Sequence, residues 1–113
     1  MCIRDRYQGA LANVPRLVRP LTIDGVRHIW QSYVVMLDED LDRAAVMAHM
    51  QANDIETTIG TYAVSAQPAF TSPGRHLPGS LNAYRHSLCL PLHGRMTATD
   101  VEEVVDCLLQ AVE

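Results

Sequence analysis

The segment from Thr97 to Val112 constrains the fold of this 113-residue chain more than any other. Its T-x-x-D start, Thr97 to Asp100, resembles a capping box, in which side chains bind the free N–H groups of the first helical turn. Apolar residues follow at helical spacing, at positions 101, 104, 105, 108 and 112, and acidic or amide residues occupy the other side. Such a helix buries one stripe, so the chain must supply a surface for it to pack against.

Three shorter segments predict strands that can form this surface. Residues 28–37 are rich in β-branched and aromatic side chains, with apolar residues on both faces. Residues 57–62 predict a short second strand. Leucines alternate at positions 88, 90 and 92 and predict a third strand, which Pro91 places at a sheet edge or ends.

Three further helical segments accompany these strands. Residues 41–51 predict a helix with Asp40 as its N-cap, and Asn53-Asp54 are suited to end it because both tolerate positive φ. Its buried stripe is expected to comprise Val46, Met47 and Met50. Residues 80–86 predict a short helix capped by Ser80, and residues 6–13 predict the end of another, with Asn13 as a left-handed cap.

The order of these elements predicts an α/β (α+β) domain. We expect a small, mostly antiparallel three-stranded sheet with helices packed mainly on one face. Residues 63–80 hold three prolines and two glycines and form a long connection, a kind of loop that is usually functional or mobile.

Charge and composition exclude several classes of protein. The net charge of −4 argues against a general nucleic-acid binder, which needs a surplus of positive charge. No apolar run approaches the roughly 20 residues that a membrane span requires, and no signal peptide is recognisable, so a cytoplasmic location is expected. His86, Cys89 and His93 have metal-like spacing but lack a fourth ligand, so a buried thiol is the preferred interpretation of Cys89 and no metal is expected.

Five segments match one family pattern in the right order. On these residues the chain resembles the C-terminal part of the DegT/DnrJ/StrS family of pyridoxal-phosphate-dependent sugar aminotransferases. The matching residues are Arg6-Tyr7; His28, Trp30, Tyr33 and Val35; Arg43, Val46, Met50 and Ile55; Ile59, Gly60, Thr61, Tyr62, Gln67, Pro68 and Phe70; and Leu88, Leu90, Pro91, Leu92, Met96, Thr97, Asp100, Val101, Glu102, Val104 and Val105. Asp54 stands where the family usually has glycine, and Ser65 where many relatives have histidine.

The resemblance implies a parent enzyme that transfers an amino group, typically from glutamate, to a keto-sugar nucleotide for polysaccharide or amino-sugar biosynthesis. The parent would use pyridoxal 5′-phosphate, held as a Schiff base on a lysine amine. The chain has nine arginines and no lysine. We therefore expect it to be inactive alone, to bind no cofactor and to contain no catalytic residue.

The resemblance also implies partners and a division of the chain. Residues 1–6 are expected to be a non-native leader, residues 7–20 a linking helix end and extended segment, and residues 21–113 the small domain. A large N-terminal domain would be missing, and the parent would be a homodimer. Without that domain, an apolar face including Tyr7, Leu11, Trp30 and Val35 is expected to be exposed.

The candidate substrate-binding residues are Thr61, Tyr62 and Gln67 in the loop that follows Gly60. In the family this loop borders the active site, and neutral hydroxyl and amide groups can recognise sugar hydroxyls and phosphate oxygens. A local structural role is the competing interpretation of all three residues. The alternative for the whole chain is a free-standing α/β module that binds a ligand or a protein without catalysis, and the upstream reading frame would distinguish the two.

Overall fold

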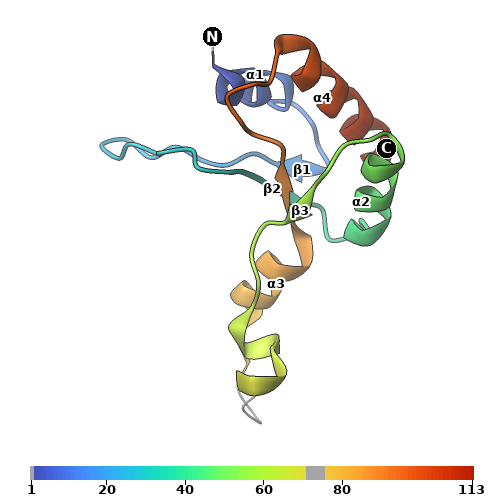
Figure 1. Ribbon diagram of the computed structural model, residues 1–113. Helices are drawn as coiled ribbons and strands as arrows, with labels where there is room; N and C mark the ends of the chain where they lie inside the picture. Colours follow the sequence, from blue (N-terminus) through green and yellow to red (C-terminus); the bar gives the residue numbers. More distant parts are fainter. Residues whose placement is uncertain (1, 71–75) are drawn as a thin grey trace.

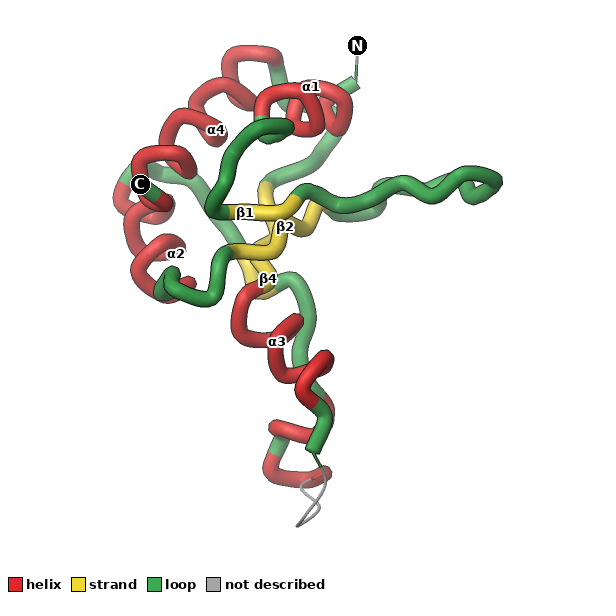
Figure 2. Tube along the Cα trace, turned by 180° about the vertical axis from the view of Figure 1, so that it is seen from behind, coloured by secondary structure: helices red, strands yellow, loops and turns green. Residues whose placement is uncertain are grey.

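A four-stranded antiparallel sheet lies at the centre of the protein. The computed structural model describes residues 2–70 and 76–113. The strands are β1 (Leu17–Val18), β2 (Tyr33–Leu37), β3 (Thr58–Ile59) and β4 (Ser87–Leu90), in the spatial order β1-β2-β4-β3. Figure 2 labels β1, β2 and β4 of this sheet. The α/β class and the antiparallel sheet are confirmed, but the sheet has four strands and not three. The extra strand, β1, has only two residues, too few to produce a recognisable alternation.

Three helices pack together beside this sheet. α1 (Ile3–Ala10), α2 (Arg43–Ala52) and α4 (Ala98–Val112) form an arc in Figure 1, and α4 contacts both of the others. Alternate residues of β2 are buried, so one face of this strand points into the core and the other is half-buried. The core lies between that face and the helices. Its largest fully buried side chains include Tyr7, Leu11, Tyr33, Val35, Met50, Leu88, Leu90 and Leu108.

The predicted C-terminal helix is confirmed at its start and along its buried stripe. The Oγ1 atom of Thr97 accepts a hydrogen bond from the N–H of Asp100 at 3.1 Å. The Asp100 carboxylate accepts one from the N–H of Thr97 at 2.8 Å, which completes the capping box. The predicted apolar positions are buried, and Cys107 is buried with them.

Helix α2 begins two residues later than predicted. Asp42, and not Asp40, is its N-cap, and its carboxylate accepts hydrogen bonds from the N–H groups of Ala44 and Ala45. Asp40 lies in the turn between β2 and α2. The predicted end is confirmed, because Asn53 is the C-cap and Asp54 has a φ of +62°, a left-handed conformation that aspartate tolerates. Val46 and Met50 are buried, while Met47 is partly exposed.

The predicted strand over residues 28–37 is wrong in its first half, because β2 begins only at Tyr33. Trp30 has a φ of +53°, which no strand residue adopts. Its N–H donates to Nδ1 of His28 at 2.9 Å, and the two rings stack with centroids 3.9 Å apart. This local turn replaces strand pairing in the segment. The second predicted strand is likewise shorter than expected and ends at Ile59.

Two other predicted caps are also wrong. Helix α3 (Pro78–His86) begins before Ser80, with Leu77 as its N-cap and Pro78 in the first turn, where proline lacks only an N–H that has no helical partner. Asn13 is not a left-handed cap, because Trp30 and Asp54 are the only non-glycine residues with positive φ in the described ranges. Pro91 follows β4 and ends it as predicted, although β4 is a central strand and not an edge.

Two arms project from the packed body in Figure 1. The first arm, residues 19–32, runs out from β1 and returns to β2 through a turn at Asp24-Gly25. The second arm, residues 60–70 and 76–86, contains the short 3₁₀ helices η1 (Val64–Ala66) and η2 (Pro68–Phe70) and returns along α3. No helix in the described ranges is long and apolar enough to cross a membrane.

The exposed apolar side chains lie on the arms and not on the predicted face. Tyr7, Leu11 and Val35 are fully buried in the core, and Trp30 is partly buried against it. The helices of the same chain cover them, a long-range arrangement that the sequence pattern alone does not show. The large exposed apolar residues are Val18, beside the first arm, Leu21, Ile23, Val26 and Ile29 on that arm, and Tyr62, Val64 and Phe70 on the second arm.

Candidate substrate-binding site

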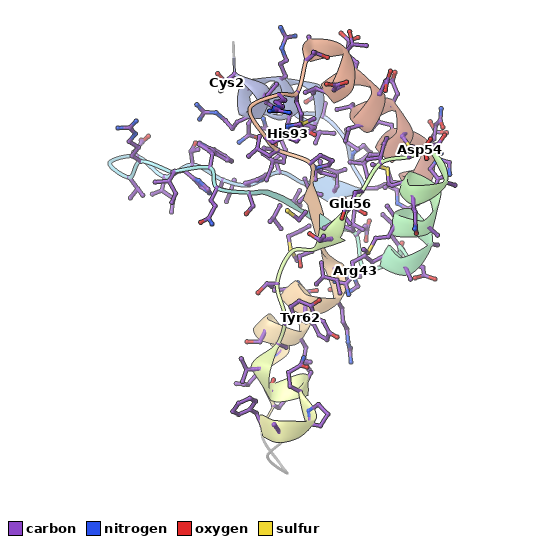
Figure 3. The ribbon with its side chains drawn as sticks, viewed as in Figure 1. Cys2, Arg43, Asp54, Glu56, Tyr62 and His93 are labelled. Atoms are coloured by element: carbon purple, nitrogen blue, oxygen red, sulfur yellow. The ribbon has the colours of Figure 1, made fainter. Side chains whose placement is uncertain are left out.

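The three predicted substrate-binding residues all lie on the outgoing limb of the second arm. Thr61 and Tyr62 follow strand β3 after Gly60, and Gln67 lies between η1 and η2. Thr61 and Tyr62 are exposed, whereas Gln67 is half-buried. In Figure 3, Tyr62 lies on the arm close to α3, on the side of the sheet away from α4. The structure thus places the three residues on one segment that extends beyond the packed body.

Gly60 packs tightly at the base of this segment. A β-carbon built at Gly60 would lie 2.5 Å from Cγ1 of Val34 and 2.8 Å from both Cβ and Oγ of Ser87. Side-chain atoms do not approach that closely, so only glycine fits here without a shift of its neighbours. In the structure, the absence of a side chain at Gly60 therefore serves packing against β2 and β4.

Backbone contacts hold Thr61 and Gln67 in place. The N–H of Thr61 donates to Oγ of the buried Ser87 at 3.1 Å, and the N–H of Gly60 donates to the Ser87 carbonyl at 3.5 Å. The side-chain amide of Gln67 donates to the carbonyl of Ala63 at 3.3 Å. The contact of Gln67 is the kind expected if this residue has a local structural role. Thr61 is held through its backbone N–H, which leaves its side-chain hydroxyl exposed.

Tyr62 belongs to a row of ring and cation contacts that joins the second arm to α2. Its ring lies 5.6 Å from that of Tyr84, centroid to centroid, with 32° between the planes. On α2, the guanidinium carbon of Arg43 lies 5.6 Å from the Tyr84 ring centroid. Tyr62 is nevertheless 64% exposed, so its ring rests on one neighbour and still presents a large surface to a ligand. Sequence reasoning missed Tyr84, because nothing near it in the chain indicates these partners.

A hollow of about 540 Å³ lies at the other end of β4, away from the second arm, and none of the predicted substrate-binding residues lines it. Ile55, Leu90, Met96 and Val104 supply apolar lining, and Asp54, Glu56, His93, Asp100 and Glu103 contribute titratable groups. Glu56 and His93 are labelled near it in Figure 3. No local motif in the sequence marks this hollow, because its lining comes from three separate stretches of the chain.

The described residues contain no group of three or more histidine, cysteine or acidic side chains placed to hold a metal ion. Nδ1 of His86 is buried and has no hydrogen-bond partner among the residues that the structure describes. Arg75, a basic residue that could meet a nucleotide diphosphate by its charge, lies outside the described residues.

A pyridoxal phosphate cofactor does not fit the residues of this chain. Its attachment requires a lysine amine, and none of the 113 residues is lysine. The hydroxyl groups of Thr61 and Tyr62 can donate and accept hydrogen bonds with a polar ligand, but they cannot replace that amine. The loop therefore offers neutral hydroxyl and amide groups to a polar ligand and no amine to the cofactor.

Comparison with a family model and with a curated protein gives matches that extend along nearly the whole chain. The model of the "DegT/DnrJ/EryC1/StrS aminotransferase family" matches residues 2–109. The spore coat polysaccharide biosynthesis protein SpsC of Bacillus subtilis (strain 168) is 28% identical over 119 aligned positions, which cover 98% of this chain and 31% of SpsC.

Solved structures agree with this match. The aminotransferase TlmJ of Streptoalloteichus hindustanus has a TM-score of 0.86 and 28% identity, over 96% of this chain and 29% of TlmJ. A DegT DnrJ EryC1 StrS aminotransferase from Brucella abortus has a TM-score of 0.78 and 25% identity, over 97% of this chain and 29% of its own. The chain thus spans about a third of the length of the relatives that it matches.

Proposed function

The chain belongs to the DegT/DnrJ/EryC1/StrS aminotransferase family, and we propose that it forms the C-terminal part of a sugar aminotransferase. The complete enzyme would transfer an amino group, from glutamate, to a keto-sugar nucleotide. The observation that carries this proposal is the family match over residues 2–109. The 28% identity to SpsC, a protein named for polysaccharide biosynthesis, supports a sugar substrate.

In this proposal the chemistry and the recognition of the substrate are divided along the polypeptide. Pyridoxal phosphate, when bound, supplies the electron sink for amino transfer, and a lysine outside this chain holds it. The chain alone is then inactive. It contributes the small domain, which packs on a large domain within a homodimeric enzyme located in the cytoplasm. Neither nucleic acid nor membrane is a partner.

Thr61, Tyr62 and Gln67 are the residues that we propose for contact with the sugar nucleotide. Their hydroxyl and amide groups match the neutral donors and acceptors of a sugar and its phosphates. Tyr62 is the strongest of the three, because its ring is fixed against Tyr84 and is still largely exposed. Preorganised aromatic side chains of this kind bind ligands with little loss of conformational freedom.

A kinetic comparison of the two half-reactions in the complete protein tests this function. Tyr62→Phe should lower kcat/KM for the keto-sugar nucleotide by roughly 5- to 150-fold, which corresponds to about 1–3 kcal/mol for one unpaired polar group. The half-reaction with glutamate and the absorbance spectrum of the cofactor should not change. Val64→Ala is the matched control, because it alters an exposed apolar residue of the same arm without removing a donor.

Two results would count against the proposal at different levels. A complete protein that transfers no amino group to any keto-sugar nucleotide would refute the proposed reaction. Unchanged sugar-nucleotide kinetics in Tyr62→Phe would leave the reaction standing but would make Tyr62 a packing residue.

A further inference from the structure

Arg43 makes an unusual set of contacts for a surface arginine. It is the first residue of α2, and its Nη1 atom donates to the carbonyl of Tyr84 and, at 3.2 Å, to the carbonyl of Ser87. These carbonyls lie at the C-terminal end of α3, where the last carbonyl groups lack helical partners. Within the described residues, Arg43 has no carboxylate within ion-pair distance. Its charge is therefore directed at the negative end of a helix dipole.

The same guanidinium also stacks on an aromatic ring. Its carbon lies 5.6 Å from the centroid of Tyr84, a distance at which a cation is attracted to the face of the ring. A planar guanidinium can lie over a ring and donate to carbonyls at its edge at the same time, which a lysine ammonium cannot do. Arg43 thus holds both the backbone and the side chain of the last turn of α3.

These contacts reach the candidate substrate-binding residues through two routes. Tyr84, which Arg43 covers, packs against Tyr62 with ring centroids 5.6 Å apart. Ser87, to which Arg43 also donates, accepts the N–H of Gly60 through its carbonyl and the N–H of Thr61 through its hydroxyl. Arg43 therefore ties together the outgoing and returning limbs of the second arm at the point where they leave the sheet.

We propose that Arg43 is a positioning residue for substrate recognition, which orients Thr61 and Tyr62 by clamping the base of the second arm. This inference rests on the proposed function, because Arg43 would support the residues to which that function assigns substrate binding. Arg43 itself need not touch the substrate. In the absence of the clamp, Tyr62 would lose the ordered ring beneath it, and the base of the arm would no longer hold Thr61 and Tyr62 in one orientation.

The test uses the complete protein with Arg43→Met, which keeps an unbranched apolar side chain but removes the donors and the charge. The KM for the keto-sugar nucleotide should rise about tenfold, the scale expected for residues coupled within one contact network. The kcat value and the glutamate half-reaction should not change. The variant should weaken binding of the sugar nucleotide equally in the ground state and in the transition state, and it should leave the chemical step unchanged. Arg85→Met is the matched control: Arg85 is an exposed arginine of α3, near Arg43 in the fold.

Hydrogen exchange in the same variant gives a readout that does not depend on activity. The amides of Gly60 and Thr61 should exchange faster in Arg43→Met, while those of α4 keep their protection. An unchanged KM for the sugar nucleotide would overturn the proposal. Equal losses in both half-reactions, with faster exchange throughout the domain, would also overturn it, because they would show a general structural role.

The proposed function and this inference can fail separately. If the complete wild-type protein does not use a keto-sugar nucleotide, the proposed function fails. The exchange measurement then still decides whether Arg43 orders residues 60–62.

Discussion

Two tyrosine hydroxyls are buried between the helices and the sheet, and each donates one hydrogen bond. Tyr7 donates to the carbonyl of Pro91 at 2.7 Å, and Tyr33 donates to Oε1 of Gln8 at 3.0 Å. Their ring centroids are 4.9 Å apart. Burial raises the pKa of Tyr33 to about 12. Burial also raises the pKa of Tyr7, and the neighbouring Tyr33 adds to that shift.

These shifts predict a loss of stability in alkali. An unfolded tyrosine has a pKa of about 10, so above that pH the unfolded chain releases protons that the folded chain retains. Below about pH 10 these two tyrosines should therefore make the free energy of unfolding neither rise nor fall with pH. As the pH rises from about 10 toward about 12, the free energy of unfolding should fall. Urea melts across this range should show a smaller fall in Tyr33→Phe than in the wild type. Tyr62→Phe, at an exposed tyrosine, is the control, and an equal fall in all three proteins would contradict the assignment.

The capping box predicts a measurable cost for a single hydroxyl. Thr97→Ala removes the acceptor of the Asp100 N–H and should lower the free energy of unfolding by about 1 kcal/mol. Glu103→Ala lies on the exposed side of the same helix and should have a much smaller effect. Thermal melts that show equal effects for the two variants would mean that the Thr97 cap does not stabilise the helix.

At the residue scale, local contacts could be predicted and distant ones could not. The Thr97 cap was predictable because its partner lies three residues away. Asp40 was predicted in place of Asp42 because both carboxylates suit a cap, and the path of the chain out of β2 decides between them. The role of Arg43 was not predictable, because Tyr84 and Ser87 lie 41 and 44 positions further along the chain.

At the scale of elements, the close packing of Gly60 predicts an unusual sensitivity. Gly60→Ala would place a methyl group 2.5 Å from Val34 and 2.8 Å from Ser87, and should destabilise the protein by about 1–3 kcal/mol through overpacking. Val34→Ala in the same background should recover part of the loss. Gly79→Ala is the control, because a methyl group there meets no atom of the described residues within 4 Å and α3 would gain a better helix former. Equal melting temperatures for the two alanine variants would contradict this packing.

The helices and strands were largely predictable from the sequence, but the residues at which they begin and end were not. Strong periodicity identified α4, and the alternating leucines identified β4. The segment before β2 reads as a strand by composition, yet the His28–Trp30 stack and the positive φ of Trp30 remove it from the sheet. Family resemblance assigns the candidate site to its loop, and that assignment stays a prediction. The stack of Tyr62 on Tyr84 that supports it appears only once the two limbs of the second arm come together.

At the scale of the whole molecule, the two arms make the chain more extended than a compact domain. Its radius of gyration is 15.1 Å, against about 13 Å for a compact chain of this length. The first arm carries Leu21, Ile23, Val26 and Ile29 with most of their surface exposed. Exposed apolar patches of this kind mark surfaces that other protein elements cover.

We therefore expect the isolated chain to associate as its concentration rises. Ile23→Ser combined with Ile29→Ser should weaken this association, because it removes apolar surface from the first arm without changing the core. Sedimentation at increasing concentrations measures the effect, and Glu102→Ala is a control on the exposed side of α4. A wild-type chain that stays monomeric at every concentration would argue instead for a free-standing module.

Reductive trapping of the cofactor tests most directly whether the chain is the lysine-free part of a pyridoxal-phosphate enzyme. The complete protein and the 113-residue chain are each treated with pyridoxal phosphate and borohydride, with the α-amino group blocked, and their intact masses are measured. We predict one stable adduct per complete protein, on a lysine outside this chain, and none on the chain alone. A stoichiometric adduct on the isolated chain, or no adduct on the complete protein, would contradict the proposed division of cofactor chemistry and substrate recognition.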